Sequence, residues 1–290
     1  MRGDRSANVD DLINIDAEVV IDTSGYTPDA VRASALAVAA RVRQYVFVST
    51  IDAYDLTQPE IDESSATRVL PAGAQTSEMD VELYGAHKAR CERELVEILG
   101  PERVTIVRAG LMAGPYDATD RFTYWPVRVE RGGDVLAPRE RSMPVQLVDV
   151  RDVACWVVGS IAQKLSGVFN LTGNPGELTI GDVLEIAQRA TGSDARFTWV
   201  PDSFLVERAV APWIEMPLWL PADLEEFRGL LRIRNERARA TGLRLRPLDE
   251  TIRDVLAEYH QRDKGWPLRA GLSSAREAEL LASWLSVKAS

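Results

Sequence analysis

The chain reads Tyr84-Gly85-Ala86-His87-Lys88 at a predicted helix, and the apolar run of residues 45–48 upstream ends in Ser49-Thr50. Residues four apart on a helix lie one turn above each other on the same face, so the Tyr84 phenol and the Lys88 ammonium are expected to address one bound molecule. A tyrosine has an ordinary pKa of about 10, and a nearby cation favours the phenolate and lowers that pKa. We therefore predict that Tyr84 exchanges a proton with a substrate alcohol or carbonyl.

Three predicted strands carry polar or glycine residues at their C-terminal ends. The strands cover residues 17–22, 45–50 and 104–108. The first leads into Ser24-Gly25 and the third into Ala109-Gly110, while the segment 28–42 begins with a proline and has the apolar stripe of a crossover helix. Open parallel α/β sheets present catalytic groups at the carboxyl ends of their strands. The alternation therefore predicts such a sheet, with the functional site at that edge.

Further elements are predicted on either side of the tyrosine. Residues 55–79 are polar and longer than most connections in compact domains, which predicts a lid on the substrate side. The following helix is expected to span Asp80–Leu99, and another helix Asp120–Arg131. A last core strand is predicted at residues 167–171, and Thr179 begins a helix with a capping-box pattern.

These motifs resemble the extended short-chain dehydrogenase/reductase family, which holds nucleotide-sugar epimerases, dehydratases and related reductases. The segments that carry the resemblance are YVFVSTIDAY (45–54), YGAHK (84–88), VRAGLMAGPYDATDRFTYW (107–125), VQLVDVRDVACWVV (145–158) and GLSSAREAELLASW (271–284). The resemblance covers essentially the whole chain. It implies an α/β fold with a Rossmann-like doubly wound parallel sheet and a smaller, mixed α/β C-terminal substrate lobe. It also implies an NAD(P)-dependent oxidoreductase or epimerase that acts on a hydroxyl/carbonyl centre.

The resemblance also implies roles for individual residues. Thr50, Tyr84 and Lys88 form the expected catalytic set, and Thr50 is preferred to Ser49 because Tyr54 follows it by four residues. The implied cofactor-binding residues are Asp4, Gly25, Tyr84, Lys88, Ala109, Gly110 and Leu111. The candidate substrate residues are Asp52, Arg121, Trp213 and Trp219. The family's dehydratases place an Asp-Glu pair after the threonine, where this chain has Ile51-Asp52, so reduction or epimerisation is favoured over dehydration. Asp52 is either a second acid/base or a turn residue.

One family feature is missing from this sequence. A turn of G-x-x-G-x-x-G type between a first strand and a helix would hold the cofactor pyrophosphate, and the glycine pairs at 110/114, 132/133 and 173/176 all follow the tyrosine. The opening residues 1–5 resemble the end of the family's third strand instead. We expect a chain that lacks the N-terminal glycine-rich βαβ half and is impaired in cofactor binding, unless that half lies upstream. The choice between NAD and NADP stays open.

The regular alternation of strands and helices ends at about residue 172. The sequence therefore predicts a partial Rossmann-like cofactor and catalytic domain over 1–172 and a substrate-binding lobe over 173–290. Within the lobe, the segment APWIEMPLWLP (211–221) either lines an apolar substrate cleft or covers the sheet.

Composition narrows the class of protein further. A net charge of −10 argues against non-specific binding to nucleic acid or anionic membrane. With two cysteines and two histidines, neither a zinc site nor a Ser-His-Asp hydrolase is easily assembled, so no metal is predicted. The sequence contains no visible signal peptide and no apolar stretch of the ~20 residues that a membrane span needs, which predicts a cytoplasmic protein.

Two further expectations concern partners. The substrate is predicted to be a small molecule, either a nucleotide-sugar or another alcohol or ketone, and the family's mode of pairing predicts a homodimer through the helix at Asp80–Leu99. A non-catalytic binding or subunit protein, which would contact RNA or another protein, remains the alternative because the glycine-rich turn is missing. The acidic charge weighs against RNA, and the retained Thr50, Tyr84 and Lys88 weigh against a loss of chemistry.

Overall fold

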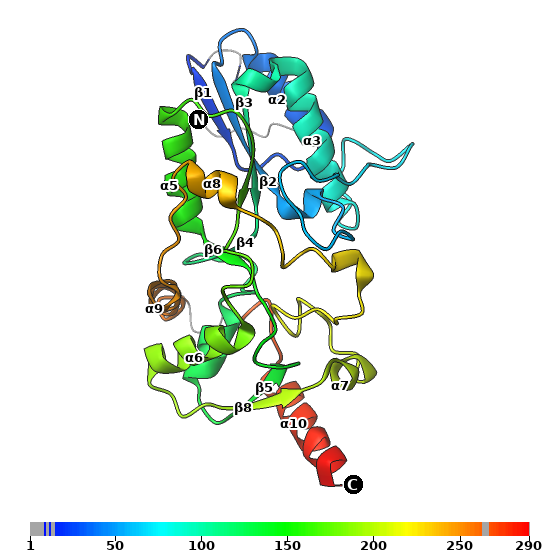
Figure 1. Ribbon diagram of the computed structural model, residues 1–290, viewed down its shortest axis with the longest axis vertical. Coiled ribbons are helices and arrows are strands. Elements are labelled where there is room, and N and C mark those ends of the chain that lie inside the picture. Colours follow the sequence, from blue (N-terminus) through cyan, green and yellow to red (C-terminus); the bar gives the residue numbers. More distant parts are fainter. Residues whose placement is uncertain (1–8, 10–11, 13–14, 263–266, 290) are drawn as a thin grey trace. The chain divides into compact units, whose positions relative to one another are not determined.

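The computed structural model describes residues 9, 12, 15–262 and 267–289 (Figure 1). The chain forms two compact units, and each unit is assembled from separate stretches. The first unit comprises residues 1–110, 152–172 and 226–244, and the second comprises 111–151, 173–225 and 245–290. The chain passes from one unit to the other after residues 110, 151, 172, 225 and 244.

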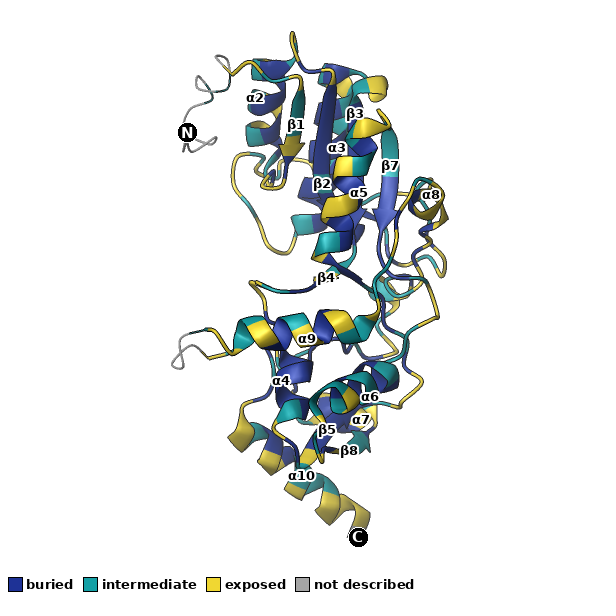
Figure 2. Cartoon of the chain, turned by 90° about the vertical axis from the view of Figure 1, so that its left-hand side faces the viewer, coloured by how far each residue is buried: buried dark blue, intermediate teal, exposed yellow. Residues whose placement is uncertain are grey.

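The first unit is built on a parallel four-stranded sheet with the strand order β1-β2-β3-β7. The strands are β1 (Val19–Asp22), β2 (Gln44–Thr50), β3 (Val104–Ala109) and β7 (Gly167–Leu171). The central strands β2 and β3 read as nearly continuous apolar runs, which is typical of a sheet covered on both faces, and Figure 2 shows them as largely buried. The predicted parallel α/β sheet is confirmed. Thr50 is paired with Ala109, so both strands end at the same edge.

Helices cover this sheet. They are α2 (Pro28–Val38), α3 (Tyr84–Leu99), α5 (Val150–Ala162) and the short α8 (Glu236–Ala240), with 3-10 turns η1 (Ile51–Ala53), η2 (Pro101–Arg103) and η3 (Glu225–Phe227). α2 and α3 bury their apolar sides with β2 and β3 in one core cluster, and α5 packs through Trp156 on Phe169 of β7. The expected helix start at Asp80 is wrong. The Asp80 carboxylate accepts the Glu82 amide at 2.9 Å and holds a turn there, so α3 begins at Tyr84.

The second unit is mixed α/β. It contains two parallel strand pairs, β4 (Leu111–Ala113) with β6 (Leu147–Asp149), and β5 (Asp134–Pro138) with β8 (Arg196–Val200). Its helices are α4 (Tyr124–Glu130), α6 (Ile180–Thr191), α7 (Asp202–Glu207), α9 (Leu248–Tyr259) and α10 (Ser274–Ala289). The predicted capping box at Thr179 is confirmed. The predicted start of a helix at Asp120 is wrong, because Asp120 has a φ of 57° and left-handed backbone cannot continue a right-handed helix. Within the described chain, no helix combines the length and the apolar character needed to cross a membrane.

The segment predicted as a lid, residues 55–79, is anchored in its first half. Leu56 and Ile61 are fully buried in a small apolar cluster, and bridges join Ile61 to Ile233 and Tyr54 to Thr67. From Val69 to Glu82 the side chains are mostly exposed. A mobile segment is therefore expected to be shorter than the predicted loop and to lie between Arg68 and α3.

Digestion by a glutamate-specific protease tests this division of the loop. Cleavage requires the chain to open locally. We expect early cleavage after Glu78 and Glu82, and slow cleavage after Glu60 and Glu63, whose neighbour Ile61 must leave its cluster first. Mass spectrometry of the fragments identifies the sites. Equal rates at the four positions would contradict the anchoring.

Gly85 allows α3 to begin directly against η1. A Cβ atom at this position would lie 2.0 Å from the Asp52 carbonyl oxygen and 2.7 Å from its carboxylate Oδ2. Both contacts are far inside van der Waals distance, and the backbone atom cannot move without shifting η1. The glycine therefore fixes how closely the first turn of α3 approaches the end of β2.

Replacement of Gly85 by alanine is expected to lower the thermal unfolding midpoint, because overpacking of a tight contact typically costs about 1–3 kcal/mol. Gly159→Ala provides the matched control. Gly159 is also helical, but a Cβ there would meet only the flexible Gln163 amide, at 3.9 Å, so alanine should stabilise by about 0.5–1 kcal/mol. Thermal denaturation of both variants checks the pair, and an equally tolerated Gly85→Ala would show that the contact is not tight.

Candidate active site

Thr50 and Tyr84 meet at the carboxyl end of β2. Thr50 is the last residue of β2, and its Oγ1 accepts the Asp52 amide at 3.1 Å. Tyr84 is the first residue of α3, and its hydroxyl lies near enough to the Thr50 side chain for Thr50 to lower the pKa of the phenol. The helix brings the phenol here because Gly85 lets its first turn touch η1. The structure thus joins two of the three predicted catalytic side chains.

The third predicted side chain, Lys88, is buried next to two strand ends. It is 2% exposed, and its Nζ donates to the carbonyl oxygens of Gly25 and Val48, each at 2.7 Å. The ammonium also lies 4.1 Å from the centroid of the Phe47 ring. Carbonyl oxygens and an aromatic face together compensate a buried cation for its lost water. Two predicted cofactor-binding residues, Gly25 and Lys88, are therefore in direct contact.

Only glycine fits at position 25 in its present conformation. A Cβ there would lie 2.5 Å from the Phe47 ring, 2.8 Å from Val31 and 2.9 Å from the Asp22 carboxylate. Asp22 in turn accepts the Ser24 amide and the Tyr45 hydroxyl. The turn after β1 is thus pressed against the sheet, which leaves its backbone carbonyl within reach of Lys88.

The pKa of Tyr84 differs from the sequence-based expectation. Burial raises it to about 12, and the charges of Tyr26, Asp52 and Cys91 act in the same direction, whereas the nearby Thr50 side chain lowers it. The expected lowering by the lysine is wrong, because the ammonium donates to the carbonyl oxygens of Gly25 and Val48 and burial of the phenol dominates. At neutral pH the phenol is protonated and can donate a proton.

Asp52 contributes to the start of the helix. Burial raises its pKa, which the Arg68 guanidinium at 3.0 Å and the Gly85 amide both lower. The carboxylate thus lies close to the Gly85 amide in the first turn of α3, where amides have no partner inside the helix and negative charge is favoured. Of the two readings that the sequence leaves open, this arrangement favours the turn residue over a second acid/base.

Ser49 is occupied by a buried polar network that sequence reasoning missed. Its Oγ donates to Glu92 Oε1 at 2.5 Å, and Arg108 Nη2 donates to Glu92 Oε2 at 2.6 Å. The Arg108 guanidinium also lies 4.3 Å from the centroid of the Tyr54 ring, whose hydroxyl donates to Asn170 at 2.7 Å. The signal was available, since Arg108 is a charged residue in an otherwise apolar strand. Ser49 is therefore committed to this network, whereas the Thr50 side chain lies beside Tyr84.

Gly110 and Thr172 lie side by side after β3 and β7. The Gly110 amide donates to the Leu171 carbonyl at 2.9 Å, and a Cβ at Gly110 would lie 2.4 Å from Thr172 Oγ1. That hydroxyl oxygen is buried and has no hydrogen-bond partner among the described residues. Ala109, also predicted, is buried at the end of β3. Leu111 begins β4 in the second unit, and Asp4 lies outside the described residues.

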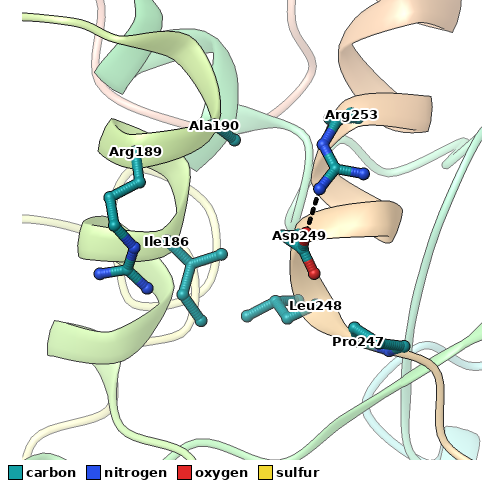
Figure 3. A pocket seen from close by; sticks show the side chains of 7 residues that line it. All are labelled: Ile186, Arg189, Ala190, Pro247, Leu248, Asp249 and Arg253. Carbon is teal, nitrogen blue, oxygen red and sulfur yellow. Dashed lines mark hydrogen bonds and ion pairs between the residues drawn. The ribbon is translucent and has the colours of Figure 1, made fainter.

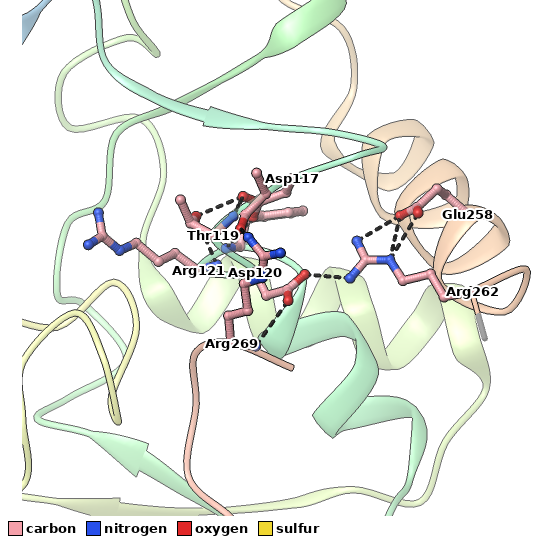
Figure 4. A network of polar contacts seen from close by, with 9 residues as sticks. Asp117, Thr119, Asp120, Arg121, Glu258, Arg262 and Arg269 are labelled. Carbon is pink, nitrogen blue, oxygen red and sulfur yellow. Dashed lines mark hydrogen bonds and ion pairs between the residues drawn. The ribbon is translucent and has the colours of Figure 1, made fainter. Parts of the chain in front are cut away.

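The candidate substrate residues of the second unit have different environments. Arg121 extends away from the ion pairs of its neighbour Asp120, as Figure 4 shows, and its guanidinium lies 5.9 Å from the ring centroid of the half-buried Trp213. Asp120 is buried and binds Arg262 at 2.6 Å and the Arg269 amide at 3.0 Å. Trp219 is 0% exposed, and its indole donates to Asp202 at 2.8 Å. Of the two alternatives for this segment, a cleft wall or a core residue, Trp219 is therefore a core residue.

A hollow of about 540 Å³ lies in the second unit between α6 and α9. Figure 3 shows Ile186 and Leu248 facing each other across it, with Arg253 paired to Asp249 on α9. It contains no predicted site residue. Among the described residues, no group of three or more His, Cys, Asp or Glu side chains is placed to hold a metal ion.

Comparison with known proteins relates the chain to a group of solved structures. No protein-family model matches the sequence, and a search of curated proteins finds no match. RMD from Pseudomonas aeruginosa, solved with NADPH, aligns over 91% of this chain and 89% of its own, with 16% identity and a TM-score of 0.62. WbmG from Bordetella bronchiseptica, solved with NAD and UDP, aligns over 90% and 78%, with 17% identity and a TM-score of 0.61.

A third match is dTDP-4-dehydrorhamnose reductase from Bacillus anthracis, solved with NADP. It aligns over 87% of this chain and 86% of its own, with 16% identity and a TM-score of 0.61. At 16–17% sequence identity, the similarity to these structures establishes the fold of this chain. The chain therefore has the Rossmann-type α/β fold of the extended short-chain dehydrogenases/reductases.

Proposed function

We propose that the protein is an NAD(P)-dependent oxidoreductase or epimerase that acts on a hydroxyl/carbonyl centre through Thr50, Tyr84 and Lys88. The observation that carries this proposal is the nearness of the Tyr84 hydroxyl to the Thr50 side chain at the carboxyl end of β2, where Thr50 lowers the pKa of the phenol. The buried Lys88 one helical turn later supports it, as does the reductase-type fold.

Each residue has a distinct part in this proposal. The protonated Tyr84 phenol donates its proton to a substrate carbonyl oxygen and takes it back in the reverse direction. Thr50 holds the phenol and offers a second hydroxyl to the same substrate oxygen. Lys88 would exchange a carbonyl partner for ribose hydroxyls, which would leave its charge closer to the developing phenolate. A bound nicotinamide supplies or accepts the hydride.

The described residues fit one end of such a cofactor. Gly25 and Gly110 bring backbone close to the strand ends, and Thr172 Oγ1 beside Gly110 is a buried hydroxyl with no hydrogen-bond partner in the described part of the chain. These are the features expected where the nicotinamide ribose binds. The turn from β1 into α2, residues 23–27, has a single glycine. Among the described residues no glycine-rich turn offers its amides to a pyrophosphate.

The proposed substrate is a nucleotide-sugar. Of the proteins with this fold, MoeE5 was solved with the nucleotide-sugar UDP-glucose and NAD, and WbmG with the nucleotide UDP and NAD. Reduction or epimerisation is favoured over elimination of water, because Asp52 is the single carboxylate after Thr50 and is already engaged with Arg68 and Gly85. We further propose a homodimer through α3, as the sequence suggests.

The alternative is a binding or subunit protein. The observation that favours it is β1, which is an edge strand among the described residues and has Ile21 46% exposed. Tyr26 in the following turn and Leu36 on α2 are also exposed. An edge with apolar side chains invites a further strand or a partner. A protein of this kind would retain its partner after Tyr84→Phe, whereas an enzyme would lose turnover.

The affinity of this chain for dinucleotides is expected to be low. Helix N-termini and glycine-loop amides normally supply the phosphate contacts, and the turn at 23–27 does not provide them. We expect dissociation constants for NAD(H) and NADP(H) of about a millimolar or weaker, which corresponds to roughly −4 kcal/mol. Titration calorimetry on the purified chain measures them. A micromolar constant would show that another segment holds the phosphates.

Three variants separate chemistry from structure at the strand end. With saturating reduced cofactor and a panel of UDP-, dTDP- and GDP-linked 4-keto sugars, Tyr84→Phe should lower turnover by the ~10²–10⁴-fold typical of a lost general acid. Thr50→Val should also lower turnover. Ser49→Ala is the matched control. It removes a hydrogen bond to the buried Glu92, which is expected to cost about 1.5–3 kcal/mol of stability, while the folded enzyme keeps its turnover.

The assay follows loss of reduced-nicotinamide absorbance, and thermal denaturation monitors the fold of each variant. Full activity of Tyr84→Phe would contradict its role as the acid. A Ser49→Ala protein that is folded but as inactive as Thr50→Val would move the catalytic role to Ser49.

A further inference from the structure

Tyr26 is an exposed tyrosine in the short turn between β1 and α2. The turn is fastened at both ends. The Asp22 carboxylate accepts the Ser24 amide at 3.1 Å, and the Thr27 carbonyl oxygen accepts the Val31 amide at 3.1 Å. The backbone that carries the Tyr26 ring is therefore fixed with respect to β1 on one side and α2 on the other.

The Tyr26 ring lies beside the Lys88 ammonium. Lys88 Nζ is 5.6 Å from the centroid of the Tyr26 ring and 4.1 Å from the centroid of the Phe47 ring. Both distances lie within the roughly 6 Å over which an aromatic ring attracts a cation. Because the rings belong to β2 and to the turn after β1, the ammonium of α3 is joined to two elements of the sheet side by aromatic contacts as well as by hydrogen bonds.

Tyr26 differs from the other neighbours of this ammonium in its exposure. Gly25 and Phe47 are buried and Val48 is half-buried, whereas Tyr26 is 50% exposed. A ligand that comes from solvent to Lys88 therefore comes within reach of the Tyr26 ring. The residue next to the predicted Gly25 thus belongs to the same site, although the sequence did not single it out.

Tyr26 also influences Tyr84. After burial, the charge of Tyr26 is the strongest of the effects that raise the pKa of the Tyr84 phenol, ahead of the charges of Asp52 and Cys91. Coulomb interactions weaken with distance, so the two phenols lie near each other. Tyr26 is therefore close to both residues of α3 that the proposed function uses, Tyr84 and Lys88.

We propose that Tyr26 is a positioning residue of this site, a role that rests on the proposed function. Its ring holds the Lys88 ammonium where the ammonium meets the hydroxyls of a nicotinamide ribose, so that less side-chain freedom is lost when the cofactor binds. Exchange of one carbonyl oxygen for a ribose hydroxyl leaves Lys88 beside the ring, because the lysine backbone stays in α3. The aromatic face supplies the attraction, so phenylalanine should replace Tyr26 and alanine should not.

Labelling of lysines tests the contact without an enzyme assay. The whole chain is acetylated briefly with an N-hydroxysuccinimide ester, and mass spectrometry compares Lys88 with the exposed Lys164 in the same sample. We expect Lys88 to react slowly in the wild type and at least about threefold faster in Tyr26→Ala, the scale of one lost cation–π contact. Tyr26→Phe keeps the ring and should react as the wild type does.

Leu36→Ala is the matched control for the labelling. Leu36 on the neighbouring α2 is exposed to a similar extent, 55% against 50% for Tyr26, and its replacement should leave the Lys88 rate unchanged. Thermal denaturation monitors the fold of each variant. If Tyr26→Ala unfolds, Tyr26→Leu takes its place with the same expected rise, because leucine offers no aromatic face. A wild-type Lys88 rate without the ring, or an equal rise in Leu36→Ala, overturns the proposal.

Kinetics separate this role from the proposed function. Tyr26→Ala should raise the KM for the reduced cofactor at least about threefold while kcat changes less, the mark of lost uniform binding. Tyr26→Phe should keep the wild-type KM, and so should Leu36→Ala. An active wild type whose KM survives Tyr26→Ala overturns the positioning role and leaves the proposed function intact. An inactive wild type contradicts the proposed function, and the labelling then decides on its own whether Tyr26 holds Lys88.

Discussion

The buried ion pair of Glu92 and Arg108 is the interaction on which the rest of the first unit depends. Tyr84, Lys88 and Glu92 are spaced four residues apart, so they share the side of α3 that faces the sheet. Because Arg108 belongs to the central strand β3 and Ser49 to β2, the Glu92 carboxylate fixes the helix against both strands. Removing one member of such a pair typically costs about 3–5 kcal/mol. The positions of Tyr84 and Lys88 follow from this attachment, which lies about two turns beyond the tyrosine and one turn beyond the lysine.

Burial and hydrogen bonding on this face of α3 set the protonation of Tyr84 and the partners of Lys88. Burial keeps Tyr84 protonated, and Lys88 is satisfied by backbone carbonyl oxygens. The Tyr84 phenol is therefore protonated, and the Lys88 ammonium is bound to backbone carbonyl oxygens and does not lower the pKa of the phenol. Under the proposed function, a ligand that draws the ammonium away from Gly25 and Val48 would bring its charge closer to the phenol and would lower the pKa of Tyr84.

The sequence predicts features that have a local cause, and it does not predict features that depend on contacts between distant residues. The strand at 167–171, the helix start at Pro28 and the capping box at Thr179 each have a local physical cause, and the structure confirms them. The start of α3 was misplaced because Asp80 is as good a turn residue as it is a helix cap. The ion pair of Glu92 and Arg108 could have been suspected from the sequence, because Arg108 is a charged residue within an apolar strand. The contact of Tyr26 with Lys88 could not, because the turn after β1 and the helix α3 lie far apart in the sequence.

The interleaving of the two units has a consequence for how the chain is made. β7 and α5 complete the first sheet, yet they are synthesised only after residues 111–151, which belong to the second unit, have left the ribosome. The second unit likewise waits for α9 and α10, which follow residues 226–244 of the first. Neither unit can therefore finish folding before the other has begun. A nascent chain must keep the open side of β3 unpaired while about 60 further residues emerge, at a few seconds' delay for typical rates of synthesis.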